Sequence, residues 1–314
     1  MIFNNSLSFI VANGKGELAA LFAAALWAVA SVVYGIVGQR IPPLQLNVVK
    51  GIVAIACLIL TILFTRETFP ISASIPILLL CLSGVIGIGW GDTAFLAAIN
   101  YLGARRVLLI GTLSPPITAI AANIFLQEQL NLSAWCGILL TILGVAWVIT
   151  ERVSGDGDHS PKHLWTGIGF GLLATMTNAI ATVISRAALN TGSVSPLWAA
   201  LLRLSAAEIV LLFWIVVQRK NQEFSYPYWQ SWRIIFATCF AAFCGTYLGI
   251  WLQQTAIKFT AAGIASTLLQ TSPLFVIPIA VLMGEKVSWR AIAGVIIAIM
   301  GIGLLFYLQG IGDS

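Results

Sequence analysis

Charged side chains are scarce in this 314-residue chain, in which Asp, Glu, Lys and Arg together make up only 9% of the residues. Soluble domains carry about 25% of these residues. Here 59% of the sequence is apolar and the mean hydropathy is +0.97. A globule of this size cannot enclose so much apolar surface, so most of it must face lipid. The shortage of charge therefore excludes a soluble protein and indicates a membrane protein.

Long basic runs are missing as well. The formal net charge is +5, and no cluster of cations exceeds the pairs Arg105-Arg106 and Arg219-Lys220. So thin a positive charge argues against nucleic acid as a partner. The excess is instead typical of loops that face one membrane leaflet.

Motifs for catalysis, nucleotides and metals are also absent from the sequence. It contains no HExxH, GxSxG or P-loop motif, and the strings GIGWG and GIGFG lie inside apolar runs with no strand before them. The five cysteines form no CxxC pair, and His159 and His163 straddle Pro161. The sequence therefore predicts no cofactor, no ATP site, no metal site and no catalytic residue.

What the chain does have is a series of long apolar runs. Roughly 20 helical residues cross a hydrocarbon layer of about 30 Å. Runs of that length without any charge cover residues 18–39, 107–127, 129–150, 164–185, 234–257, 259–284 and 291–312. Three more runs contain ions and cover residues 42–64, 75–99 and 196–217. Because membrane strands are short and alternate in polarity, the runs predict an all-α membrane protein with ten transmembrane helices.

The second half of the chain repeats the first. At an offset of 157 positions, matching residues in the last two runs of each half are Pro116 and Pro273, Glu128 and Glu285, Gly137 and Gly294, and Gly144 and Gly301. At an offset of 158 the third runs align through GxxxG pairs at 87–91 and 245–249, a spacing that lets helices pack closely. At an offset of 153, Lys50 aligns with Arg203. Five helices is an odd number, so the second half must enter from the opposite side, which predicts two inverted five-helix repeats.

One polar stretch separates the two halves. Residues 151–162 read ERVSGDGDHSPK, with five predicted helices before them and five after. We expect a first repeat over residues 1–150, a polar linker over 151–162 and a second repeat over 163–314.

These features together resemble the EamA-type branch of the drug/metabolite transporter superfamily. The resemblance covers residues 17–307 and rests on Ser114-Pro115-Pro116 and Ser272-Pro273, on Glu128 and Glu285, and on the glycine-spaced last helix of each repeat. It implies a secondary transporter that exports or exchanges a small polar metabolite, such as an amino acid, by alternating access between the repeats. It further implies a multi-pass protein of the plasma (inner) membrane that binds its substrate and the bilayer and requires no oligomer.

Ions inside the predicted helices are candidates for the transport site, because an ion at the bilayer centre costs about 2.5 to 3.5 kcal/mol. Lys50 and Arg203 either reach the headgroups or form structural pairs, or they bind an anionic group of the substrate. Asp92 is too short to reach the surface, so it either couples transport to protons, contacts the substrate or forms a fixed pair with one of these cations. Ile250 aligns with Asp92, which makes the repeat asymmetric there. Glu208 turns away from Arg203 along its helix and is expected to be an interhelical partner or an interfacial group.

Other polar and aromatic residues inside the runs complete the candidate lining of the cavity. They are Trp27, Trp90, Asn178, Trp251, Gln253, Gln254 and Gln270. Tryptophan also serves in packing or as an interfacial anchor, whereas amides in lipid need partners and should point inward. The prolines expected to kink two helices at matching points are Pro115, Pro116, Pro273 and Pro278.

Two alternatives and one conflict remain at this stage. The chain could be a non-transporting receptor or scaffold, or an intramembrane enzyme with Asp92 as acid or base. The resemblance implies cytoplasmic termini, but this orientation would place four helix-end cations inside and ten outside, against the positive-inside rule. The four on the side of the termini are Lys15, Arg66, Arg186 and Lys258.

Overall fold

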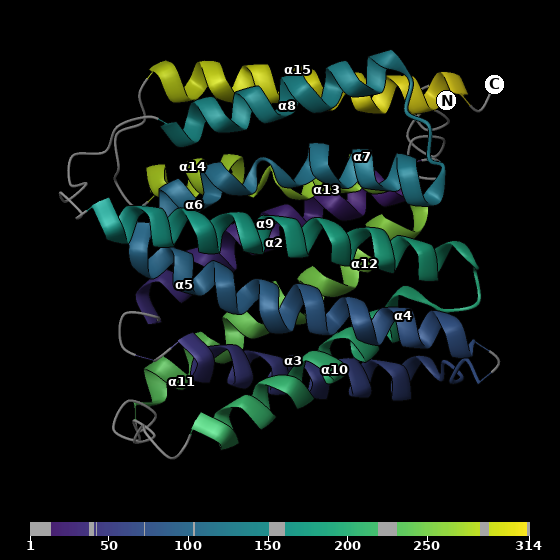
Figure 1. Ribbon diagram of the computed structural model, residues 1–314, viewed down its shortest axis with the longest axis vertical. Helices are drawn as coiled ribbons and strands as arrows, with labels where there is room; N and C mark the ends of the chain where they lie inside the picture. The colour runs from purple at the N-terminus through teal and green to yellow at the C-terminus, as the bar shows by residue number, and fades with distance from the viewer. Residues whose placement is uncertain are drawn as a thin grey trace.

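The computed structural model describes residues 14–37, 41, 43–71, 73–102, 104–150, 161–218, 231–282 and 289–312. This part of the chain consists of helices joined by turns and short extended links (Figure 1). In the first half they are α2 (Lys15–Val37), α3 (Pro43–Thr65), α4 (Ser74–Gly84), η1 (Val85–Gly91), α5 (Asp92–Leu102), α6 (Ala104–Gly111), α7 (Ser114–Leu126) and α8 (Leu132–Thr150). In the second half they are α9 (Pro161–Asn190), α10 (Pro196–Gln218), α11 (Trp232–Ala241), η3 (Ala242–Leu248), α12 (Gly249–Phe259), α13 (Ala262–Leu269), α14 (Ser272–Leu282) and α15 (Trp289–Gly312).

These helices form ten crossing units. Four units are composite: α4, η1 and α5 make one, α6 and α7 another, and the second half repeats both patterns with α11, η3 and α12 and with α13 and α14. Within the described residues, eight units are long and apolar enough to span a membrane, and the apolar parts of α8 and α15 are shorter. The prediction of an all-α membrane protein with ten transmembrane helices is confirmed.

The helix boundaries differ from the charge-free runs at one notable place. The run 164–185 stops before Arg186, but α9 continues to Asn190 because that side chain finds partners inside the protein. The same helix begins at Pro161, so the last two residues of the predicted linker are already helical, while positions 151–160 lie outside the described residues.

The two halves pack on each other through equivalent glycines. In η1, Cβ atoms placed at two glycines would meet side chains of α9, the pairs being Gly87 with Ala181 and Gly91 with Thr177. In the second half the matching glycines meet side chains of α2, the pairs being Gly245 with Ala30 and Gly249 with Trp27. Each composite third unit therefore lies against the first helix of the other half, a close packing that the GxxxG spacing allows without specifying the partner helix.

The last helices of the two halves, α8 and α15, run side by side along one edge of the bundle (Figure 1). Their closest approach is also duplicated. A Cβ at Gly144 would meet the backbone of Gly294 and Ala298, and one at Gly301 would meet the backbone of Gly137 and Thr141. The offset of 157 that aligns the sequences converts one set of contacts into the other, so the pair is antiparallel and related by the twofold relation of inverted repeats.

The bundle has one end at which several helix ends meet, which we name the Lys15 end after the first residue of α2. Gly16 lies against Thr260 in the turn between α12 and α13. The chain just before α8 contacts the start of α13, and Gly137 near the start of α8 lies against Leu305 near the end of α15. The first described helix therefore begins at the end where the last one finishes, as an even number of crossings requires.

The predicted proline kinks take the form of helix breaks. A turn at residues 112–113 separates α6 from α7, and Pro115 and Pro116 then lie in the first turn of α7, where a missing N–H costs nothing. A turn at 270–271 precedes Pro273 in the same way. Of these four prolines, only Pro278 lies beyond the first turn of its helix, in the interior of α14.

The α8–α15 contact makes a direct prediction about stability. Replacing Gly144 by Ala should lower the unfolding free energy by about 1 to 3 kcal/mol, because the added methyl group overlaps backbone that cannot move aside. Gly303→Ala on α15 is the matched control, since no atom lies within 4 Å of its Cβ position. Thermal or denaturant unfolding in detergent measures both; equal stability of the two variants would contradict the close approach.

Candidate functional site

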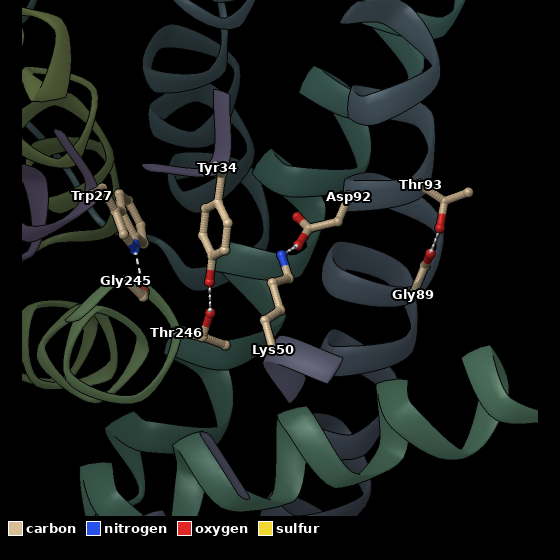
Figure 2. A network of polar contacts seen from close by, with 8 residues as sticks. All are labelled: Trp27, Tyr34, Lys50, Gly89, Asp92, Thr93, Gly245 and Thr246. Atoms are coloured by element: carbon tan, nitrogen blue, oxygen red, sulfur yellow. Dashed lines mark hydrogen bonds and ion pairs between the residues drawn. The ribbon is translucent and has the colours of Figure 1, made fainter. Parts of the chain in front are cut away.

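Two π-helical turns stand at equivalent places in the third unit of each half. They are η1 and η3, and π-turns of this kind widen a helix and occur often at functional sites. Asp92 follows η1 directly, and Thr246 lies within η3. Thr93 Oγ1 donates a hydrogen bond to the carbonyl oxygen of Gly89 at 2.6 Å, which satisfies an acceptor of the widened turn (Figure 2). The turns thus direct two polar side chains toward the space between the halves.

Lys50 and Asp92 form an ion pair inside the bundle. Lys50 Nζ on α3 donates to Asp92 Oδ2 at 3.1 Å (Figure 2). The side chains are 19% and 37% exposed, respectively. The pair that the sequence left as an alternative for Asp92 is therefore present in this state of the protein.

Arg203 on α10 lies close to the same carboxylate. It is 3% exposed, and a Cβ at Gly87 would lie 3.4 Å from its Nη2 atom, one helical turn before Asp92. Asp92 is the charged group that interacts electrostatically with Arg203. Lys50 is bound to Asp92 and Arg203 is buried, so both cations lie inside the bundle in this structure.

Glu208 completes a cluster of four ions. It is 6% exposed on α10, and its Oε2 atom lies against Gly51 on α3, the residue that follows Lys50. Glu208 and Lys50 interact electrostatically. The expectation of an interhelical position was correct, but α3 brings this acid next to the other ions. We name Lys50, Asp92, Arg203 and Glu208 the ion cluster; its formal charges sum to zero.

The ion cluster has unused hydrogen-bonding capacity. In the part of the chain that the structure describes, buried atoms without a hydrogen-bond partner include Nε and Nη1 of Arg203, Oε1 of Glu208, and both amide atoms of Asn47. Asn47 lies one helical turn before Lys50 on α3. Buried polar atoms nearly always have partners in proteins, so a group of such atoms indicates a place for water or for a polar ligand.

Side chains of α2 lie across from the ion cluster and bind η3. Trp27 Nε1 donates to the carbonyl oxygen of Gly245 at 2.8 Å, and the hydroxyl groups of Tyr34 and Thr246 are 3.3 Å apart (Figure 2). Tyr34 also interacts electrostatically with Lys50. These bonds join the first helix of one half to the π-turn of the other, so any movement between the halves must alter them.

The other predicted lining residues do not gather at the ion cluster. Gln270 Nε2 donates to the carbonyl oxygen of Gly111 at 2.7 Å, and the Trp251 ring lies 6.1 Å from that of Tyr247 in an apolar cluster. Gln253 is half-buried, whereas Trp90 and Asn178 are exposed. These five residues therefore have separate surroundings in the structure and do not form one site.

Gln254 is a separate case. It is completely buried on α12, and neither of its amide atoms has a hydrogen-bond partner among the described residues. The adjacent turn of the same helix packs Ile250 into the apolar cluster around α10. The amide of Gln254 is thus a second buried polar group inside the bundle.

Sequence reasoning missed three residues that the structure brings to the site. Asn47 could have been found, because helical spacing puts it on the face of Lys50. Tyr34 and Thr246 carried no such signal, since an isolated tyrosine or threonine in an apolar run is common. Their place depends on how the two halves pack.

Comparison with known proteins agrees with this architecture. A model of the EamA-like transporter family matches residues 14–150 and 165–307. The magnesium transporter NIPA3 of Pongo abelii is 30% identical over 107 residues, an alignment that covers 32% of this chain and spans 26% of that protein's length. A chain from a solved crystal structure has a TM-score of 0.77 at 14% identity, covering 96% of this chain and 100% of that one, and so shares the fold.

The two family matches coincide with the two halves that pack through equivalent glycines and that share the π-turns. Together they cover most of the chain, including the four residues of the ion cluster. Membership in a transporter family also answers the enzymatic and receptor alternatives in favour of transport. The chain belongs to the EamA-like transporter family and is a multi-pass membrane transporter.

Proposed function

We propose that this protein transports a small zwitterionic metabolite, such as an amino acid, which binds at the ion cluster. The proposal rests on buried atoms that have no hydrogen-bond partner among the described residues. They are two N–H donors of Arg203 and one carboxylate oxygen of Glu208, which is an acceptor. A solute carboxylate would accept from the first, and a solute ammonium group would donate to the second.

The charge balance of the ion cluster supports a substrate without net charge. Two cations and two acids already neutralise each other in a region packed between helices, where an added charge costs several kcal/mol. A zwitterion preserves this balance and still supplies both kinds of hydrogen-bonding group. A simple anion would satisfy Arg203 and leave Glu208 unmatched.

Alternating access follows from the inverted repeats and from the asymmetry of the ion cluster. Lys50 has Asp92 as its partner, whereas the repeat-related position of that acid is Ile250, so Arg203 lacks an acid of its own. Without substrate, Asp92 therefore serves both cations. We infer that binding of a solute carboxylate to Arg203 replaces its interaction with Asp92, and that this exchange lets the halves rearrange.

We propose protons as the coupling ion, because ionisable side chains inside membrane helices commonly form proton relays in pumps and transporters. We propose export or exchange of the solute across the plasma (inner) membrane, driven by a proton gradient or by the solute's own gradient. Neither route requires ATP.

Magnesium ions, which the name of the partial relative suggests, fit this site poorly. Mg²⁺ prefers oxygen ligands in octahedral geometry. Among the described residues, no group of three or more His, Cys, Asp or Glu could hold a metal ion. The proximity of Lys50 and Arg203 would also repel a divalent cation.

The first prediction concerns the two cations. Arg203→Gln and Lys50→Gln should each weaken the apparent affinity for the solute by about tenfold or more. The first removes the donor to the solute carboxylate, and the second removes the partner of Asp92, which then competes with the solute for Arg203. Arg203→Lys should fall between Gln and wild type, since it keeps the charge but not the planar fork. Exchange in proteoliposomes of the radiolabelled amino acid that the wild type transports, chosen from a panel, measures the effect.

Arg233→Gln is the matched control for these variants, because Arg233 is an exposed cation on α11. Its affinity should equal that of the wild type. Unchanged affinity in both Lys50→Gln and Arg203→Gln, at normal expression and folding, would remove the substrate from the ion cluster.

The second prediction concerns Asp92. Asp92→Asn should abolish accumulation driven by a proton gradient but retain exchange between equal pools, since exchange moves no net protons. A purely structural pair would instead lose both activities, because Lys50 would remain buried without a partner. The double variant Lys50→Gln/Asp92→Asn removes that cation and distinguishes loss of folding from loss of coupling. Wild-type accumulation by Asp92→Asn would exclude a coupling role.

A further inference from the structure

A second ion pair lies at the Lys15 end, away from the ion cluster. Arg186 near the end of α9 binds Glu128 in the link between α7 and α8, with Nε and Oε1 2.5 Å apart. The two side chains are only 15% and 14% exposed, respectively. Such a pair is well shielded from water, unlike a surface ion pair, so its loss has a measurable cost.

Both residues of this pair also hold the turn between α12 and α13. Arg186 Nη1 donates to the carbonyl oxygens of Ile257 at 2.8 Å and Lys258 at 2.6 Å. Glu128 Oε2 accepts from the backbone N–H of Ala262 at 2.9 Å. The guanidinium thus caps two of the last carbonyls of α12, while the carboxylate caps the first N–H group of α13, each at the helix end that favours its charge.

These contacts connect the two halves of the transporter. Glu128 belongs to the first half, whereas Arg186 and the turn belong to the second. A third contact crosses the same boundary, because Thr260 Oγ1 donates to Glu17 Oε1 of α2 at 2.9 Å. We name Glu17, Glu128, Arg186 and residues 257–262 the turn clamp.

The opposite end of the bundle lacks the repeat-related counterpart of Arg186. The equivalent contacts of Ala30 and Ala181 with η3 and η1 relate α2 to α9 by an offset of 151 positions. This offset places Gly35 where Arg186 stands, and glycine has no side chain to bind a carboxylate or to cap a helix. The arginine of the turn clamp therefore has no repeat-related counterpart.

We propose that the turn clamp is the gate at the Lys15 end, which is closed in this structure and opens when Glu128 separates from Arg186. The proposal rests on the alternating access argued above and adds the residues that close one side. Arg186 is a positioning residue: it acts on the turn between α12 and α13, and α12 continues directly from η3 at the transport site. Movement of the turn is thereby transmitted to the helix that bears Thr246.

The clamp also predicts a bias between the two access states. Opening the Lys15 end must break the ion pair and leave the ends of α12 and α13 without their caps. At the opposite end, Gly35 stands in the place of Arg186, and the described residues there show no such pair. The closed Lys15 end should therefore be the resting state of the empty protein. Removing the clamp should raise the ratio of open to closed protein by about tenfold or more.

Spin-label distances in nanodiscs test the gate directly. In a background without native cysteines, labels at Phe125→Cys of the first half and at Phe259→Cys, an exposed position of the turn itself, report the separation of the first half from the turn. Labels at Leu108→Cys and Arg233→Cys report between the halves toward the opposite end. No ligand is added, so the measurement does not depend on the identity of the substrate.

In Arg186→Gln we expect the 125–259 distribution to gain a longer component while the 108–233 distribution shortens. Glu128→Gln should give the same shift, because it removes the other half of the contact, and it replaces Arg186→Gln in the test if that variant does not fold. Arg186→Lys should lie in between. Arg66→Gln is the matched control, since Arg66 is an exposed cation beside the same end and lies outside the clamp.

The outcomes separate this proposal from the one it rests on. Wild-type distances across 125–259 in both folded variants would overturn the gate and leave the transport proposal to its own tests. A longer 125–259 distance with an unchanged 108–233 distance would support the gate but contradict alternating access. A shift of equal size in Arg66→Gln would show a general effect of charge and would also overturn the gate.

Discussion

The ion cluster inside the bilayer is the constraint on which the rest of this structure depends. Four charged side chains lie within helices that are otherwise apolar, and each of them would be costly if it faced lipid. They are tolerated because α3, the third unit and α10 bring opposite charges together. The packing of the two halves must therefore be close enough to keep the cluster intact and adjustable enough to let it exchange partners.

Glycine and π-turns supply both properties. At Gly87, Gly91, Gly245 and Gly249 the backbone of each third unit lies directly against the first helix of the other half, so small shifts there change many contacts at once. The π-turns sit at the same positions, and η3 accepts hydrogen bonds from α2, such as that from Trp27 to Gly245. The polar site thus lies where the helices are both closest and least regular. The α8–α15 pair, by contrast, packs the two halves together along one edge.

Much of this fold could be predicted from the sequence, because lipid imposes a simple rule on helix length and the duplicated Gly, Pro and Glu positions reveal the repeat. Lys50, Asp92 and Arg203 were identifiable as ions in apolar runs for the same reason. Which face of each helix points inward could not be read in this way, since the runs are apolar on all sides; Trp90 and Asn178 proved to be exposed. Contacts between halves were equally hidden.

Contacts between helices explain the remaining differences between the prediction from the sequence and the structure. Glu208 joins the ion cluster only because Gly51 on α3 leaves room for its carboxylate. This contact depends on how α3 and α10 pack, which the sequence of either helix alone does not show. The helix α9 extends beyond its charge-free run because Arg186 forms an ion pair with Glu128 of the other half.

The central claim, that the ion cluster binds a zwitterion, is tested most directly by the thermal stability of the protein in nanodiscs with amino acids and their derivatives. The account predicts that an amino acid which stabilises the wild type loses this effect both as its methyl ester and as its N-acetyl form; equal stabilisation by either derivative would contradict it.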